Sequence, residues 1–378
     1  MHDANASAPD HSGVRPEAFD DDATAPETKT LRAAFLPFWI ENPYQSRLSE
    51  ELGKLGCEIV ALSSSGMTVL RRVLSERPKV IHLHWLDPLY ESKHPFASML
   101  KLAGSIAFLW FLRATGTRFV WTAHNLTKHE NKMRRLDRAC TSAIVSLSHA
   151  VIAHCESAKS ALIAEFTLGK PEKVHVIPHG NYCDIYQNTV SRTAARGQLG
   201  IAENQSVFLF LGRVRPYKGV LEMISAFRRH DAPDAVLLIA GKPLNEAAET
   251  EIRTAIGDDR RIHFHPGFVA DRDVQIYMNA CDAVVLPYQN VFTSGAAVLA
   301  MSFGRACIAP RLGCMVDWFE DDGALLYDAA DTDGLYHSLR RALMPDARLE
   351  EMGARNERLA RQWSWQTVAA LTLDAYQG

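Results

Sequence analysis

Residues 206–220, which read SVFLFLGRVRPYKGV, decide the fold class. The stretch begins with a near-continuous apolar run that ends at Leu211, as in a strand that is buried on both faces. Gly212 then allows the backbone to turn closely, and Pro216 suits the first turn of a following helix. This order predicts one strand–loop–helix unit of a parallel sheet that helices cover on both sides.

The same unit recurs along the chain in two series of short apolar runs. The first series lies at 33–37, 58–62, 80–83, 119–122, 150–153 and 174–177. The second lies at 207–211, 236–240, 262–264, 283–286, 306–309 and 325–327. We therefore expect an α/β protein with two doubly wound, Rossmann-like parallel-sheet domains that face each other across a cleft. Ligands of such sheets bind beyond the carboxyl ends of the strands.

A polar stretch at 184–205 separates the two series and predicts a domain boundary near residue 190. We expect a first Rossmann-like domain at 31–189 and a second at 190–361. Residues 1–30 have no apolar periodicity and predict a disordered acidic tail. The segment 362–378 predicts a helix that either caps the second domain or crosses back to the first.

The charge of the 378-residue chain is unevenly distributed. The formal net charge is −3, but residues 1–30 hold seven acids and two bases, so this tail carries −5 and the remainder +2. A near-neutral body excludes a nucleic-acid-binding protein whose affinity comes from a basic face.

The seven cysteines are scattered and mostly adjoin apolar residues, which predicts reduced, buried thiols in a cytoplasmic protein. No secretory signal and no run of 18 apolar residues is apparent. Residues 102–112, LAGSIAFLWFL, come nearest to such a run. They predict either a buried helix or a helix that lies on a membrane surface.

Two loops of the second series could bind anions. Arg213 offers a planar fork to phosphate oxygens, and Lys218 offers a compact positive charge, so together with Gly212 they could hold a diphosphate. Residues 293–295 form a second candidate, because Thr293 or Ser294 would cap a helix whose first amides, from Gly295 onward, stay uncovered. The alternatives are a solvated basic turn and an ordinary helix cap.

Polar residues also follow the strands of the first series. Asn42 and Tyr44 come after the first strand, and Asn42 would cap the next helix with Pro43 at its first position. His84, Trp85 and Asp87 end a third strand, and His124, Asn125 and Glu130 follow a fourth. A histidine or carboxylate there could accept a proton from a sugar or other hydroxyl, although each residue alone could be structural.

The motifs of other common enzymes are absent from the sequence. No G-x-G-x-x-G follows the first strand, and residues 241–243 lack the rest of a P-loop, so nicotinamide and P-loop chemistry are excluded. Residues 271–273 predict a helix cap rather than a pair of metal ligands. We expect no metal and no resident cofactor.

Together these motifs resemble the two-domain nucleotide-sugar glycosyltransferases of the B fold. Residues 212–213 with 218–219 resemble the donor-diphosphate motif of that family, and 267–269 resemble its loop for the nucleobase, which implies base contacts by Phe268 and Val269. The series 42–44, 82–85, 115–117, 124–130, 215–220 and 286–295 is similar to bacterial exopolysaccharide transferases of the xanthan type, which use GDP-mannose.

The resemblance implies roles for the remaining candidates. The donor diphosphate would contact Gly212, Arg213, Lys218, Thr293, Ser294 and Gly295. The acceptor would contact Asn42, Tyr44, His84, Trp85 and Asn125. The base would be Asp87, His124 or Glu130, and we favour Asp87 because a carboxylate is already deprotonated at pH 7.

One departure from the family pattern concerns the mechanism. Many retaining members carry two glutamates around the start of the last helix, and this sequence has Val291 and Leu299 at those positions. The expected reaction is therefore an inverting, metal-independent transfer of a hexose to a lipid-linked oligosaccharide in exopolysaccharide assembly. Alternatives are a retaining transferase that uses a UDP-sugar, a nucleotide-sugar epimerase, and an inactive partner protein that binds nucleotide sugars.

The expected partners follow from this assignment. They are a nucleotide-sugar co-substrate, either GDP-mannose or a UDP-sugar, a lipid-linked or oligosaccharide acceptor, and a membrane surface, but no nucleic acid. The expected location is the cytoplasm, peripherally on the inner face of the membrane.

Overall fold

The computed structural model describes residues 31–62, 66–126, 133–319 and 323–378. The predicted tail at 1–30 and the candidate base Glu130 lie outside these residues. The described chain forms two separate six-stranded sheets, and every paired strand is parallel to its neighbour. The predicted α/β class with two doubly wound domains is confirmed.

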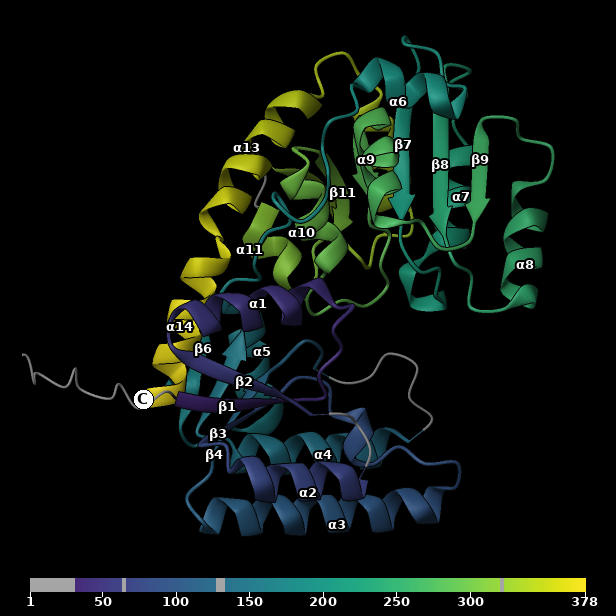
Figure 1. Cartoon of the computed structure of the whole chain (residues 1–378). Helices are drawn as coiled ribbons and strands as arrows, with labels where there is room; N and C mark the ends of the chain where they lie inside the picture. Colours follow the sequence, from purple (N-terminus) through teal and green to yellow (C-terminus); the bar gives the residue numbers. More distant parts are fainter. Residues whose placement is uncertain (1–30, 63–65, 127–132, 320–322) are drawn as a thin grey trace, which may run out of the picture. The chain divides into compact units, whose positions relative to one another are not determined.

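The first sheet has the strand order β2-β1-β3-β4-β5-β6 (Figure 1). Its strands are β1 (Leu31–Leu36), β2 (Cys57–Ala61), β3 (Val80–Leu83), β4 (Arg118–Thr122), β5 (Ala150–Ala153) and β6 (Val174–Val176). Its helices are α1 (Pro43–Lys54), α2 (Gly66–Glu76), η1 (Asp87–Leu89), α3 (Pro95–Ala114), α4 (Arg134–Leu147), α5 (Glu156–Phe166) and η2 (Pro171–Lys173).

The second sheet has the order β12-β11-β10-β7-β8-β9. Its strands are β7 (Ser206–Leu211), β8 (Ala235–Gly241), β9 (Ile262–Pro266), β10 (Ala283–Val285), β11 (Ala306–Pro310) and β12 (Ala324–Tyr327). Its helices are α6 (Arg192–Leu199), η3 (Pro216–Lys218), α7 (Val220–Arg228), α8 (Glu246–Ile256), α9 (Asp271–Ala280), α10 (Gly295–Ser302), α11 (Cys314–Phe319), α12 (Gly334–Ala342), α13 (Leu349–Gln362) and α14 (Trp365–Gln377).

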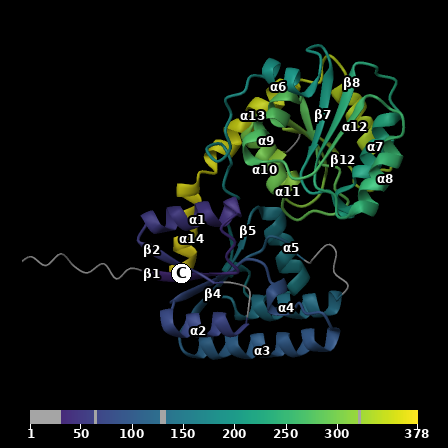
Figure 2. The same cartoon turned by 45° about the vertical axis from the view of Figure 1, so that its right-hand side comes forward.

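In the first sheet, alternate strand residues enter different cores, as the two-residue period of a strand requires. In β1, Ala33 and Phe35 pack in a cluster with α1 and α14, whereas Ala34 and Leu36 pack in a cluster that includes residues of α2 and α3. Figures 1 and 2 show α2, α3 and α4 together on one side of this sheet and α1 with α14 on the other. Burial on both faces explains why the strands read as near-continuous apolar runs.

The C-terminal helix packs on the first sheet although it follows the second in sequence. The Tyr376 hydroxyl lies 2.7 Å from Nδ1 of His82 in β3, and the Trp365 indole donates to the carbonyl of Asn181 at 2.7 Å. Tyr376 is 1% exposed, so the end of the chain is part of the core behind β3.

Two glycines fix the loops at the carboxyl ends of β7 and β8. Gly219 has φ of 66°, and a Cβ there would lie 1.9 Å from the Pro287 carbonyl oxygen. Gly241 has φ of 147°, and a Cβ there would lie 1.9 Å from the Gly212 carbonyl oxygen. The positive φ values disfavour a side chain at both positions, and the neighbouring carbonyl oxygens leave no space for one. The loops after β7, β8 and β10 therefore contact each other through their main chains.

Helix α3 is not the buried helix that was one of the two predictions for residues 102–112. Its apolar residues Phe96, Leu100, Trp110 and Phe111 are each at least half exposed. By length and composition α3 could cross a bilayer, and 17% of its most apolar stretch is buried. However, α3 joins the adjacent parallel strands β3 and β4 and buries Leu102, Leu109 and Leu112 against the domain, so we treat it as a surface helix.

The prediction that all seven cysteines are free thiols is wrong for one pair. Cys155, the N-cap of α5, forms a disulfide with Cys314 at the start of α11, across a sequence separation of 159. Two residues after Cys155, the Ser157 hydroxyl and amide both donate to the carboxylate of Asp317, three residues after Cys314. The two sheets are thus joined covalently and by hydrogen bonds at the ends of two helices.

Candidate active site

The loops at the carboxyl ends of β7, β8 and β9 line a pocket of about 840 Å³. Gly212 and Arg213 come from the first loop, Phe268 and Val269 come from the third, and Gly295 begins α10 opposite them. These five were predicted from separate motifs, and the structure brings them together in one cavity. The volume lies within the ~300 to 1,000 Å³ range of sites for small molecules.

Positive charge is concentrated on one wall of this pocket. Arg213 is exposed and makes no ion pair in the described part of the chain. Lys218 does not itself line the pocket. Its amine lies next to Gly212, which does, at 3.5 Å from the place of a Cβ on that glycine and 5.5 Å from the ring centre of Tyr288. Burial lowers the pKa of Lys218, and no carboxylate is among the groups that raise it. A diphosphate in the pocket would supply the missing negative charge.

Thr293 and Ser294 do not line the pocket, contrary to the role that the resemblance implied for them. The Thr293 hydroxyl donates to the His124 carbonyl of the first sheet at 3.2 Å. Ser294 is 6% exposed and its hydroxyl accepts from the Ala297 amide at 3.2 Å, so it is the N-cap of α10. Both side chains hold the loop, and Gly295 alone of the three faces the cavity.

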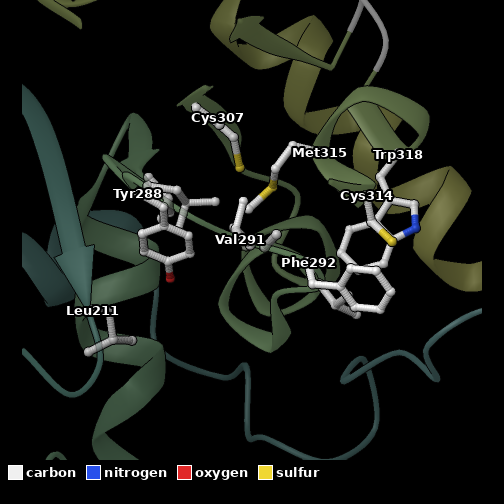
Figure 3. Packing of buried hydrophobic residues seen from close by; sticks show 14 of the residues in the cluster. Leu211, Tyr288, Val291, Phe292, Cys307, Cys314, Met315 and Trp318 are labelled. Carbon is white, nitrogen blue, oxygen red and sulfur yellow. The ribbon is translucent and has the colours of Figure 1, made fainter. Parts of the chain in front are cut away.

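The two positions at which many retaining members carry glutamates are occupied by Val291 and Leu299, and both have apolar surroundings in the structure. Leu299 lines the pocket from α10. Val291 is 8% exposed and packs in the core with Met315, next to the Phe292 side chain (Figure 3). The Cys314 amide donates to the Phe292 carbonyl at 3.0 Å, which anchors the loop before α10 to α11. Neither position can supply a carboxylate to a ligand.

Comparison with known proteins shows the family to which the chain belongs. Residues 205–344 match the family described as glycosyl transferases group 1, and residues 15–181 match glycosyltransferase family 4. The chain is 30% identical over 336 residues to GDP-mannose:glycolipid 4-beta-D-mannosyltransferase of Xanthomonas campestris pv. campestris, covering 85% of this chain and 86% of that protein. The chain belongs to the group 1 glycosyltransferases of the GT-B fold. It is a transferase.

More distant relatives and solved structures agree on the fold. The transferase is 27% identical over 301 residues to D-inositol 3-phosphate glycosyltransferase of Salinispora tropica, covering 73% of this chain and 62% of that protein. Anabaena HepE in complex with UDP and glucose superimposes with a TM-score of 0.71 at 18% identity, covering 91% of this chain and 98% of that one. Sucrose-phosphate synthase of Thermosynechococcus elongatus superimposes with a TM-score of 0.72 at 16% identity, covering 92% of this chain and 98% of that one.

A second, smaller pocket of the transferase lies at the carboxyl ends of β3 and β4 and measures about 60 Å³. His84, Trp85, Asp87, His124 and Asn125 all line it, so five residues predicted on two different strands meet here. The Trp85 and His124 rings stack with centroids 4.6 Å apart, and Nδ1 of His84 lies 3.2 Å from Nε2 of His124.

Asn42 and Tyr44, the other two predicted acceptor contacts, have structural positions in the transferase. The Asn42 side chain accepts from the Tyr44 amide at 3.0 Å and caps α1, with Pro43 next to it as predicted. Tyr44 is 3% exposed and packs edge-on against His84, His124 and Trp365. Neither residue lines the 840 Å³ or the 60 Å³ pocket, and their role as acceptor contacts stays a prediction.

Five histidines of the first sheet are held neutral by burial. Burial lowers the pKa of His82 to about 3, of His154 to about 4 and of His179 to about 3. It also lowers the pKa of His84 and His124 well below their usual range. A neutral His124 can accept a proton, but the low pKa makes the imidazolium a strong acid, so His124 is a poor base for a sugar hydroxyl.

The sequence analysis missed three residues of the site. Glu41 follows β1 and is exposed, and it lines the 840 Å³ pocket opposite the donor loops. Lys242 follows β8 and adds a further positive charge to that pocket. Trp39 is 40% exposed and stacks on Trp85 with centroids 4.4 Å apart. All three residues lie shortly after a strand, and this position in the sequence is the signal that could have found them. Lys242 belongs to the G-K-P sequence at 241–243.

No group of three or more histidine, cysteine, aspartate or glutamate side chains is arranged to hold a metal ion among residues 31–62, 66–126, 133–319 and 323–378. The carboxylates of Asp271 and Asp273 lie in the first turn of α9, and the N-cap is Ala270 without a side-chain hydrogen bond. The predicted cap by residues 271–273 is therefore wrong, although their place at a helix start is correct.

Proposed function

We propose that the transferase moves a mannose from GDP-mannose to a lipid-linked oligosaccharide, with inversion at the anomeric carbon and without a metal. The observation that carries this proposal is the 30% identity over 336 residues to the Xanthomonas enzyme, whose name specifies GDP-mannose and a glycolipid. A UDP-sugar is the second candidate donor, because Anabaena HepE, which shares the fold, was solved with UDP and glucose.

The second domain binds the nucleotide sugar in the 840 Å³ pocket. Arg213 pairs with the diphosphate through its planar fork, and the Lys218 amine neutralises the charge that grows on the leaving phosphate. The first amides of α10, at Gly295, add a positive helix end. The exposed ring of Phe268, 83% accessible, packs on the nucleobase at the pocket rim.

The first domain supplies the base. An acceptor hydroxyl attacks the anomeric carbon, its proton passes to a carboxylate, and the bond between that carbon and the diphosphate oxygen breaks with its electron pair on the nucleotide. Asp87 was favoured from the sequence, but Glu41 lines the donor pocket itself, whereas Asp87 lines the 60 Å³ pocket. A base must lie within hydrogen-bond reach of the attacking hydroxyl, so we now favour Glu41.

Two variants of the donor site test the assignment of the diphosphate. Arg213→Ala and Lys218→Ala each remove a positive charge from the leaving group and should lower kcat by about 100-fold or more, as the loss of one electrostatic stabiliser does. Lys242→Ala, on the same pocket but outside the family motif, is the matched comparison and should act mainly on KM. Near-normal turnover in both Arg213→Ala and Lys218→Ala would refute the site.

The donor and the stereochemistry require a direct assay. The transferase is incubated with GDP-mannose, UDP-glucose and other GDP- and UDP-sugars and a bacterial lipid extract, and the anomer of the product is determined. A β-mannoside formed only from GDP-mannose supports the proposal. An α-linked product from a UDP-sugar would establish the retaining alternative, and sugar interconversion without an acceptor would establish an epimerase.

We also propose that the transferase works peripherally at the cytoplasmic face of a membrane. The exposed large apolar residues of α3 are Phe96, Met99, Leu100, Trp110 and Phe111, and at about 3.6 residues per turn they share one face of the helix. Phe111 of this α3 stripe and the exposed Arg77, just after α2, line one surface pocket, and Arg71 and Arg72 of α2 are exposed as well. Apolar and basic side chains on neighbouring surfaces favour an anionic bilayer.

Flotation with phosphatidylglycerol vesicles tests this contact. The double variant Phe96→Ser/Trp110→Ser should remain in the soluble fraction, because it removes two of the three aromatic side chains of the α3 stripe. Met344→Ser, which changes a side chain with 48% exposure on the second domain, should float like the unaltered protein. Flotation of the double variant at an unchanged level would contradict the assignment to α3.

A further inference from the structure

An apolar cavity of about 310 Å³ lies between α2 and α3, outside both pockets described above. Val69, Leu70 and Val73 of α2 form one wall, and Gly104, Phe108 and Leu109 of α3 form another. Its floor is closed by the sheet residues Leu36 and Ile81. The reaction proposed for the transferase uses none of these side chains.

The chemistry of the walls selects a hydrocarbon. Among the described residues that line the cavity, Lys101 is the only charged one. Its amine donates to the Glu91 carbonyl at 3.1 Å, near the N-terminal end of α3. An apolar cavity of about 150 Å³ in another protein stays dry and accepts benzene. A cavity about twice as large has room for several more carbon atoms in a row.

The position of the cavity connects the α3 stripe with the acceptor site. On one side it is bounded by α3, whose opposite edge carries Leu100 and Phe111 of the exposed α3 stripe. On the other side it is bounded by Pro88 and Leu89 of η1. The preceding residue, Asp87, lines the pocket of about 60 Å³ where predicted acceptor contacts meet. One short 3-10 turn thus borders both spaces.

We infer that this α2–α3 cavity binds the hydrocarbon chain of the lipid-phosphate acceptor next to its phosphate. The chain would leave the bilayer beside α3 and enter between the two helices, and the Lys101 amine would face the phosphate. The carbohydrate would then extend past η1 toward the donor pocket. This inference rests on the proposed lipid-linked acceptor, but the binding site can be tested without any transfer reaction.

Alkyl phosphates of increasing length are suitable probes, because they keep the phosphate constant and vary only the chain. Binding of butyl, octyl and dodecyl phosphate to the full-length protein is measured by calorimetry below their critical micelle concentrations, with no nucleotide sugar present. Each additional buried CH₂ should raise the affinity by up to about fourfold until the cavity is full. Binding should also show a negative heat-capacity change. Equal affinity for butyl and dodecyl phosphate would overturn the inference.

A matched pair of variants separates this cavity from adsorption on the α3 stripe. Gly104 lines the cavity on α3 and has no atom within 4 Å of the place of its Cβ, so Gly104→Phe fills the space without a backbone clash. Gly53 on α1 is also helical, exposed and free of contacts at its Cβ, so Gly53→Phe is the control. Gly104→Phe should weaken dodecyl phosphate binding at least tenfold, and Gly53→Phe should leave it unchanged.

The outcomes distinguish the inference from the proposed function. Dodecyl phosphate binding that Gly104→Phe leaves intact would place the lipid on the exposed helix surface and overturn the cavity assignment, whatever sugar the enzyme transfers. Chain-length-dependent binding that Gly104→Phe abolishes would support the cavity even if the donor proved to be a UDP-sugar. Loss of binding in both glycine variants would indicate a general effect of the substitution and would overturn the assignment.

Discussion

The buried histidines make the stability of the first domain depend on pH in a range where carboxylates stay ionised. Lowering the pH from 7.5 to 5.5 protonates histidines in the unfolded chain, whose pKa is about 6.5. In the folded protein, burial holds the pKa of His82, His154 and His179 at about 3 to 4, so these three remain neutral. The unfolded state therefore binds more protons, and stability must fall as the pH falls.

The magnitude follows from the number of neutral histidines. At pH 5.5, each histidine that is protonated only when unfolded lowers the free energy of unfolding by about 1.4 kcal/mol. His82, His154 and His179 are each at most 5% exposed, so solvent does not moderate the effect. Together they should cost about 4 kcal/mol, and the lowered pKa values of His84 and His124 act in the same direction. Such a loss is a large part of a typical domain's stability.

Urea unfolding at pH 7.5 and 5.5, followed by circular dichroism and by hydrogen exchange in β3 and β4, measures this loss. His154→Gln should reduce the pH dependence by about 1.4 kcal/mol, because the lowered pKa of His154 is removed with its ring. His337→Gln, which changes an exposed histidine on α12, is the matched control for the substitution itself. A free energy of unfolding at pH 5.5 within about 1 kcal/mol of that at pH 7.5 would refute the reasoning.

Two further substitutions and one thiol titration have defined outcomes. Gly219→Ala places a methyl group against the Pro287 carbonyl and should lower the melting temperature and raise KM for the donor, as activity and thermal unfolding assays will show. Glu41→Gln should lower kcat and remove the acidic limb of the pH–rate profile, and an unchanged profile would return the role of base to Asp87. Thiol titration of the unfolded, unreduced protein should find the five free cysteines and not the Cys155–Cys314 pair, which should appear only after reduction.

The fold was readable from the sequence because both sheets are buried on two faces. Each predicted apolar run overlaps a strand, since a central parallel strand has little polar surface to interrupt the pattern. The pocket residues Arg213 and Gly295 were found for a related reason: the loops after such strands converge at one edge of the sheet.

Other features depend on distances that the sequence pattern does not encode. Glu41 lies in an irregular loop, where no periodicity marks which way a side chain faces. Thr293 and Ser294 were assigned to the ligand because a helix start has free amides, yet both hydroxyls are used within the protein. The exposure of α3 could not be predicted either, because the same apolar run suits a core and a membrane surface.

The disulfide between α5 and α11 acts as a pivot for the two halves of the enzyme. Because Cys155 and Cys314 are bonded, the ends of these helices cannot separate, and any relative motion of the two halves must keep them together. The Cys314 amide donates to the Phe292 carbonyl, and Thr293 is the next residue in the chain. The hydrogen bond between Thr293 and His124 therefore lies close to the disulfide, and we expect it to shift little when the two halves move. Displacement grows with distance from a pivot. We expect any opening for substrate exchange to displace the loops far from the disulfide more than the loops next to it.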